Sequence, residues 1–163
     1  MASRSSSARY GWEVQSSDLE LLARIAEGFA LTFAIGFERE LRGSPAGDRT
    51  FSLIGTAAAA VAAVTGASSP QALAGIITGV GFIGGGLILK GQDDVVRGIT
   101  TAATVFAVAA VGLVVGLGHL ALGLALGLLT VLILELRYLP LIRVLDARRY
   151  STRFRSDEEP PSA

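Results

Sequence analysis

The sequence has no cysteine among its 163 residues. Disulfide bridges and thiol chemistry are therefore excluded, although this absence does not identify the compartment. Charge is also scarce, since 17% of the residues are charged, against about 25% in soluble domains. The net charge is zero, so the chain offers no bulk attraction for nucleic acid.

Two long stretches lack acidic and basic residues altogether. The first covers residues 51–89, and the second covers residues 98–134, where a histidine is the one ionisable group. A soluble helix needs a polar face, and neither stretch can supply one. The sequence therefore predicts an all-α membrane protein, a bundle of about five transmembrane helices.

The spans follow from apolar length, because a bilayer core requires about 20 residues of helix. The predicted spans are residues 19–37, 51–67, 72–89, 99–117 and 120–134. The first span carries Glu20, Arg24 and Glu27, so an amphipathic helix at the membrane surface is its alternative. The resulting organisation is a polar tail at 1–18, a helix bundle at 19–139 and an Arg-rich tail at 140–163.

The basic residues predict an orientation. With the N-terminus outside, 11 of the 14 Lys and Arg residues fall on the inner side of the five spans. Cytoplasmic segments carry such an excess of positive charge. We therefore expect a bacterial inner-membrane protein with its C-terminus in the cytoplasm, where the Arg-rich tail meets anionic lipid.

Gly79, Gly81 and Gly84 have the G-x-G-x-x-G spacing of a dinucleotide-binding turn. That spacing indicates a nucleotide only between a strand and a soluble helix, with an acidic residue about 20 positions later. Residues 101–104 read Thr-Ala-Ala-Thr, and the surrounding span is hydrophobic. The pattern therefore favours small residues that let membrane helices approach closely.

Small residues recur at four-residue intervals in other spans, as in Gly112/Gly116 and in the ridge from Gly55 to Ala67. The run Gly84-Gly85-Gly86 leaves two interpretations open. One is close helix packing. The other is a break in the helix beside a polar cavity, since each glycine weakens a helix by about 1 kcal/mol relative to alanine.

An internal repeat is suggested at an offset of 48 residues. Eight identities fall between residues 35–62 and residues 83–110, among them Gly36/Gly84 and Arg49/Arg97. Both units would run helix, inner loop, helix in the same orientation. Such a parallel repeat is a construction found in transporters.

Three polar clusters lie at the predicted inner ends of the spans: GFERE at 36–40, AGDRT at 46–50 and RGITTAA at 97–103. Together with GVGFIGGGLILK at 79–90, in this order and spacing, they resemble the MgtC/SapB family of bacterial membrane proteins. The resemblance covers about residues 20–136. Family members tend to carry an Asp and an Arg before the third helix, where this chain reads SSPQ, and many carry a soluble C-terminal domain in place of a short tail.

The resemblance implies a role in adaptation to low Mg²⁺ and, in intracellular pathogens, in virulence. In the family this role is linked to restraint of the proton-driven ATP synthase through contacts in the membrane. We therefore expect a regulator with a membrane-protein partner, and its small-residue ridges favour a homodimer. The alternative is a small ion or solute transporter, favoured by the parallel repeat and the triple glycine.

The candidate functional residues combine the charged, hydroxyl and glycine positions of these clusters. They are Glu27, Glu38, Arg39, Arg49, Thr50, Gly79, Gly81, Gly84, Gly85, Gly86, Arg97, Thr100 and Thr101. In the functional interpretation Glu38 pairs with Arg39, Arg49 or Arg97; in the alternative these charges only set the topology. Thr100 and Thr101 either cap a helix or contact an ion or partner. Glu27 is a proton or cation site, or else a carboxylate that reaches the interface.

No nucleophile beside a base and no metal-ligand spacing is present, so we predict no catalytic site, no metal, no cofactor and no enzyme. The adjacent carboxylates Asp93 and Asp94 fit a solvated turn better than a Mg²⁺ site. A continuous polar path from Glu27 to Glu38 and Arg97 would favour the transporter. Dry packing of the first, third and fourth helices would favour the regulator.

Overall fold

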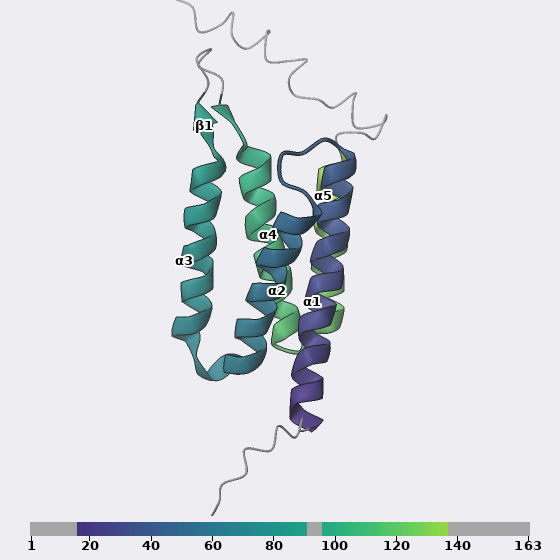
Figure 1. The fold of residues 1–163 in the computed structure, drawn as a ribbon, viewed down its shortest axis with the longest axis vertical. Coiled ribbons are helices and arrows are strands. Elements are labelled where there is room, and N and C mark those ends of the chain that lie inside the picture. Colours follow the sequence, from purple (N-terminus) through teal and green to yellow (C-terminus); the bar gives the residue numbers. More distant parts are fainter. Residues whose placement is uncertain (1–15, 91–95, 137–163) are drawn as a thin grey trace, which may run out of the picture.

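The computed structural model describes residues 16–90 and 96–136. This part of the chain contains five α-helices, one 3₁₀ turn and a pair of two-residue strands (Figure 1). In chain order they are α1 (Ser16–Leu41), α2 (Asp48–Thr65), η1 (Gly66–Ser68), α3 (Pro70–Leu87), β1 (Leu89–Lys90), β2 (Val96–Arg97), α4 (Ile99–Gly116) and α5 (Leu120–Glu135). The predicted all-α bundle is confirmed.

Successive helices run in opposite directions, so alternate ends meet at the two ends of the bundle (Figure 1). One end gathers the C-terminal ends of α1, α3 and α5 and the starts of α2 and α4. We call it the Arg39 end. Helices α1, α2 and α4 contact one another extensively, and α5 packs on α1 and α4. Helix α3 stands at the edge of the bundle, mainly against α4.

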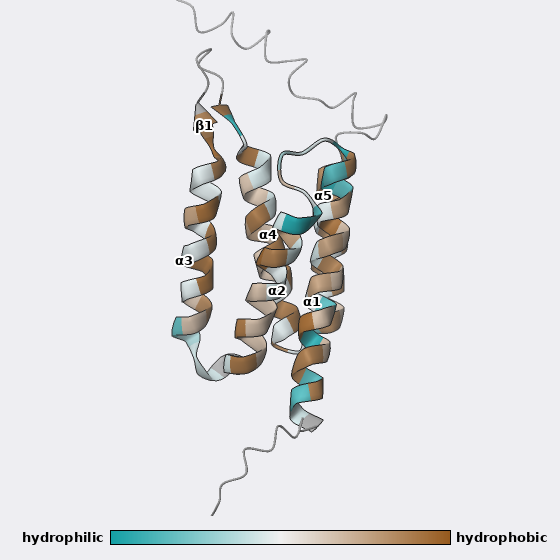
Figure 2. Cartoon of the chain, viewed as in Figure 1, coloured by the Kyte–Doolittle hydropathy of each residue, from teal (hydrophilic) through white to brown (hydrophobic). Residues whose placement is uncertain are grey.

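Helix α4 forms the centre of the core. Its side chains Val105, Val108, Val111 and Val115 are fully buried. By length and composition, α3 and α4 are able to cross a membrane, and α5 is a shorter apolar helix. Figure 2 shows the hydrophobic colouring along these helices and the polar residues collected near the ends of α1. The spans expected for α1 and α2 remain predictions.

The observed helices extend past the charge-free spans at the Arg39 end. Helix α1 continues to Leu41, because the polar residues after Phe37 prolong the helix instead of ending it. Helix α2 likewise begins at Asp48, one turn before the predicted start. Helix α3 runs unbroken through its three consecutive glycines to Leu87, so the predicted alternative of a break there is wrong.

A short hairpin that the sequence analysis missed joins α3 to α4. Leu89 pairs with Arg97 and Lys90 with Val96 in antiparallel register. Gly98 follows with a φ of +87°, and a Cβ on it would lie 2.0 Å from the carbonyl oxygen of Leu87. Only glycine fits this position, where the start of α4 touches the end of α3.

The interior between α1, α2 and α4 is closed by glycines and small side chains. A Cβ added to Gly112 would lie 2.2 Å from the Gly55 carbonyl oxygen, and one on Gly116 would lie 2.3 Å from that of Ala59. A Cβ on Gly28 would meet the Ala59 side chain at 2.7 Å. The predicted packing role of small residues is confirmed for this region.

Candidate functional site

A network of ion pairs ties the last turn of α1 to the last turn of α5. The Arg39 guanidinium donates two hydrogen bonds of 2.5 Å to the Glu38 carboxylate. Arg42, one turn later, donates bonds of 3.0 and 2.6 Å to Glu135, across 93 positions of sequence. Arg42 also lies 3.5 Å from Glu38, so the four side chains form one network.

This network confirms one of the predicted pairings of Glu38 and not the others. Glu38 pairs with Arg39, as one of the three options had it, and also with Arg42, which the sequence analysis did not single out. Arg49 lies in the first turn of α2 and Arg97 in β2, and both are exposed. The ion pairs of Glu38 among the described residues are thus with Arg39 and Arg42.

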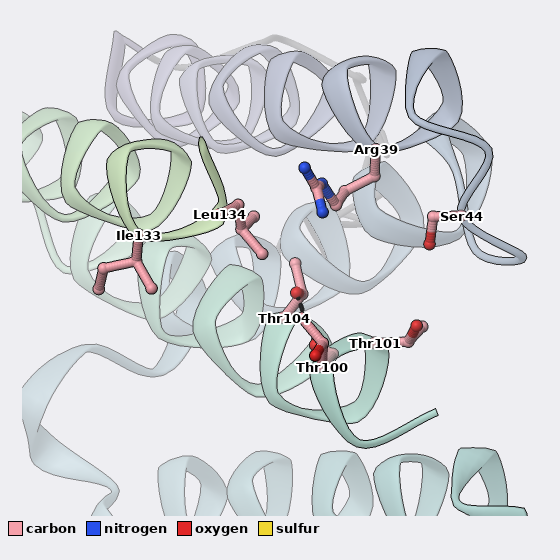
Figure 3. Close-up of a pocket in the computed structure, with 7 residues that line it drawn as sticks. All are labelled: Arg39, Ser44, Thr100, Thr101, Thr104, Ile133 and Leu134. Atoms are coloured by element: carbon pink, nitrogen blue, oxygen red, sulfur yellow. Dashed lines mark hydrogen bonds between the residues drawn. The ribbon is translucent and has the colours of Figure 1, made fainter. Parts of the chain in front are cut away.

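A cavity of about 410 Å³ opens beside this network (Figure 3). Its lining comes from α1, the α1–α2 loop, the start of α4 and the end of α5. These residues are Arg39, Ser44, Thr100, Thr101, Thr104, Ile133 and Leu134. Figure 3 shows the Arg39 guanidinium reaching from α1 towards α4 and α5. We call this cavity the Arg39 pocket.

The pocket is rich in hydrogen-bond donors. Arg39 is its one charged lining residue and is only 9% exposed. Its Nε and Nη2 atoms bind Glu38, which leaves Nη1 without a hydrogen bond among the described residues. Four hydroxyl groups complete the polar lining. Since arginine only donates and hydroxyls can donate, the pocket suits a ligand with acceptor oxygens.

A second, apolar pocket of about 210 Å³ adjoins the first between α4 and α5. The two pockets share four lining residues, which are Thr100, Thr104, Ile133 and Leu134. The additional lining residues are Ala103, Ala107 and Thr130. Polarity therefore falls along α4, away from the Arg39 end.

The threonines at the start of α4 do not cap that helix. Its N-cap is Gly98 in a left-handed conformation, and no side-chain cap hydrogen bond occurs there. The predicted capping by Thr100 and Thr101 is therefore wrong, because glycine occupies the position where a capping hydroxyl would stand. Thr100 and Thr101 line the Arg39 pocket instead.

Thr50 and Glu27 lie elsewhere. Thr50 is half-buried in the first turn of α2 and does not line the Arg39 pocket. Glu27 is half-buried in the first half of α1, three turns before Glu38. Between them α1 turns Gly28, Thr32 and Ile35 into the bundle, all buried. Thr32 donates its hydroxyl to the Gly28 carbonyl of its own helix at 2.8 Å, so no polar path follows this face.

The α3 glycines differ from those of the core. A Cβ added to Gly75, Gly79, Gly81, Gly85 or Gly86 would meet no atom of the described chain within 4 Å. Gly84 alone is in contact, at 3.7 Å from the Ala102 carbonyl oxygen of α4. The predicted close packing is therefore absent among residues 16–90 and 96–136 for these five glycines.

Several signals in the sequence could have found the missed residues. Arg42 stands one turn after Glu38, and Thr104 one turn after Thr100, so each shares a helix face with a predicted residue. Ser44 and Glu135 come from distant segments, and no local pattern connects them to Arg39. Helix α1 begins at Ser16, three residues inside the predicted N-terminal tail of 1–18. The predicted turn at Asp93 and Asp94, residues 1–15 and the predicted tail at 140–163 fall outside the described residues.

Comparison with known proteins adds an independent line of evidence. The profile of the MgtC family matches residues 25–139. The chain is 40% identical over 128 residues to YhiD of Escherichia coli (strain K12), whose name includes the words "magnesium transporter"; the match covers 71% of this chain and 57% of YhiD. No solved structure matches the chain.

Two further relatives have family names. Protein MgtC of Brucella abortus (strain 2308) is 40% identical over 134 residues, which cover 76% of this chain and 53% of that protein. Protein SapB of Bacillus subtilis (strain 168) is 33% identical over 114 residues, or 62% of this chain and 49% of SapB. The chain thus spans about half the length of the curated relatives it matches.

Proposed function

The chain belongs to the MgtC family, a membership that makes it a Mg²⁺-related membrane protein, and from this premise we propose that it regulates adaptation to low Mg²⁺ by contacting a partner within the inner membrane. The partner implied by the family resemblance is the membrane part of the proton-driven ATP synthase. The proposed contact is made by α3, and it needs no catalytic group in this chain.

One observation carries the proposal: α3 presents an uncovered face of small residues. Ala74, Thr78, Gly81 and Gly85 follow one another at intervals of three or four residues, so they share a face of the helix, and all four are exposed. In lipid, helices associate by close backbone approach at such small residues. We call these four residues the small-residue face of α3. A partner helix would find room there for backbone contact.

A magnesium transporter is the second candidate, since the name of YhiD includes that activity. Transport requires a polar route through the bundle. In the described chain the contacts between α1, α2 and α4 are made by glycines and alanines at distances that leave no room for even a methyl group. Such close packing between the levels of Glu27 and Glu38 favours the regulator.

Cross-linking tests the regulatory proposal directly. The chain has no cysteine, so single cysteines can be introduced without background. We expect Gly81→Cys, labelled with a thiol-reactive photocross-linker in cells grown at low Mg²⁺, to yield an adduct with an ATP synthase membrane subunit. The matched control is Leu128→Cys on α5, which is also exposed but lies on a different helix.

The outcomes separate the candidates. An adduct from Gly81→Cys and none from Leu128→Cys supports the proposal, and Gly81→Leu should then abolish growth at low Mg²⁺. Equal labelling at both positions would contradict it. Self-adducts alone would assign the small-residue face to a homodimer. Saturable Mg²⁺ flux into liposomes that contain only this protein would establish the transporter.

A further inference from the structure

The Arg39 pocket and the apolar pocket beside it form a single amphiphilic groove between α4 and α5. Its polar half contains Arg39 and the hydroxyls at the start of α4, and its apolar half contains Ala103 and Ala107. The two halves share Thr104 and three other lining residues, so they are continuous. We propose that this groove binds one phospholipid, with the phosphate at Arg39 and an acyl chain between α4 and α5.

The polar half matches a phosphate group. The Nη1 atom of Arg39 has no hydrogen bond among the described residues, while the rest of the guanidinium is fixed by two bonds to Glu38. Because these bonds already hold the guanidinium in place, binding a phosphate at Nη1 would cost little additional side-chain entropy. A guanidinium ordered in advance therefore binds phosphate more tightly. Thr101 from α4 and Ser44 from the α1–α2 loop add hydroxyl donors to the lining (Figure 3).

The start of α4 also favours binding of an anion. Helix α4 has 18 residues and no side-chain cap at its N-terminus, so its first N–H groups remain available to an anion. This terminus would not define a site by itself. The buried Arg39 and the two contiguous cavities define it, and the uncapped helix reinforces the preference for acceptor oxygens.

The geometry along α4 fits an amphiphile better than a free anion. From Thr100 to Ala107 the helix rises about 10 Å, at about 1.5 Å per residue. Over this distance the lining changes from arginine and hydroxyls to alanine and leucine side chains. A phospholipid at a membrane surface passes from phosphate to hydrocarbon over a comparable depth. Free phosphate would leave the apolar half unused.

Another groove in the molecule provides a matched control. It lies between α2 and α3, has a volume of about 350 Å³, and is lined by apolar residues alone, including Ala57 and Gly79. Acyl chains can fill it as bulk solvent, but it offers no partner for a phosphate. The proposed site is therefore distinguished by its polar half and not by the mere presence of an apolar groove.

The experiment is native mass spectrometry of the full chain in detergent, titrated with three probes. Dioleoyl phosphatidylglycerol has both phosphate and chains, dioleoylglycerol has the chains alone, and glycerol 3-phosphate has the phosphate alone. We expect one phosphatidylglycerol to bind at least tenfold more tightly than dioleoylglycerol, and glycerol 3-phosphate not to bind measurably. Binding of glycerol 3-phosphate as tight as the lipid would overturn the assignment in favour of a free phosphate site.

Variants locate the bound lipid. Ala107→Leu fills the apolar half and should weaken phosphatidylglycerol binding about tenfold, whereas Ala57→Leu in the α2–α3 groove should leave it unchanged. Thr101→Val should weaken binding severalfold without lowering the unfolding temperature. Arg39→Lys keeps a positive charge beside Glu38 and should also weaken binding, because lysine cannot bind both the carboxylate and the phosphate as a fork.

Two results would contradict the proposal. The first is equal affinity for phosphatidylglycerol and dioleoylglycerol in the wild type. The second is an equal effect of Ala107→Leu and Ala57→Leu. Because this titration contains no other protein, its failure is independent of the proposed contact between α3 and a partner.

Discussion

Glycines have opposite environments in two regions of this bundle. Between α2 and α4, Gly112 and Gly116 bring two backbones together, so that an added methyl group would collide with carbonyl oxygens. In α3, by contrast, Gly81 and Gly85 face open space among the described residues. The same residue type therefore closes the core of the chain in one region and leaves a surface for another molecule in the other. The glycine content of a span does not distinguish the two.

The largest expected effect comes from adding a side chain at a core glycine, where two backbones are already in close contact. Gly112→Leu would force a branched side chain against the backbone of Gly55, and we expect it to destabilise the bundle by about 3 kcal/mol or more. Circular dichroism during heating in detergent measures this as a lower unfolding temperature or as failure to fold.

The matched variant in the other region is Gly81→Leu. A leucine there enters open space, so no loss of stability is expected, and the better helix propensity of leucine should stabilise α3 by up to about 1 kcal/mol. An equal loss of stability in Gly112→Leu and Gly81→Leu would contradict the difference between the two glycine environments.

The second effect concerns the Arg39 end, where an ion pair between Glu38 and Arg39 accompanies the close contact of Gly36 with the start of α2. Arg39→Gln leaves the largely buried Glu38 without its closest partner, and we expect a loss of about 2 kcal/mol. The double variant Glu38→Gln/Arg39→Gln removes both charges and should recover part of that loss. A double variant less stable than Arg39→Gln would contradict the pairing.

Sequence patterns predicted the fold because charge is confined to a few positions. The charge-free stretches located α2, α3, α4 and α5 to within three residues of their observed bounds. The polar residues after Phe37 concealed the true end of α1, because a charge-based boundary stops where charge begins, while the helix continues. The β1–β2 hairpin is too short for any pattern of alternation to show.

The site was only partly predictable for a related reason. The motifs identified Glu38, Arg39, Thr100 and Thr101 as candidates, yet the Arg39 pocket also needs side chains from the α1–α2 loop and from α5. Such contacts join residues about 90 positions apart, and no local spacing reports them. Glu38 pairs with Arg39 and Arg42, although charge alone did not favour these two over Arg49 or Arg97.

The third prediction applies one chemical change to both regions. Gly85→Ala adds a methyl group in open space and should stabilise α3 by up to about 1 kcal/mol, since alanine is the better helix former. Gly116→Ala adds the same group 2.3 Å from a backbone oxygen and should destabilise the bundle. A higher unfolding temperature for Gly85→Ala together with a lower one for Gly116→Ala would support the comparison. Shifts of the unfolding temperature in the same direction would contradict it.

The smallest effect is expected at Arg49. Its guanidinium makes no ion pair among the described residues, and the side chain is exposed, so Arg49→Gln should change the free energy of unfolding by less than about 0.5 kcal/mol. Arg49 nonetheless belongs to the basic set from which the orientation is predicted. We expect the variant to keep its stability, and a modest rise in inverted molecules would be visible by labelling of single terminal cysteines. A stability loss like that of Arg39→Gln would mean that Arg49 has a partner within the bundle, and the network at the Arg39 end would then extend to α2.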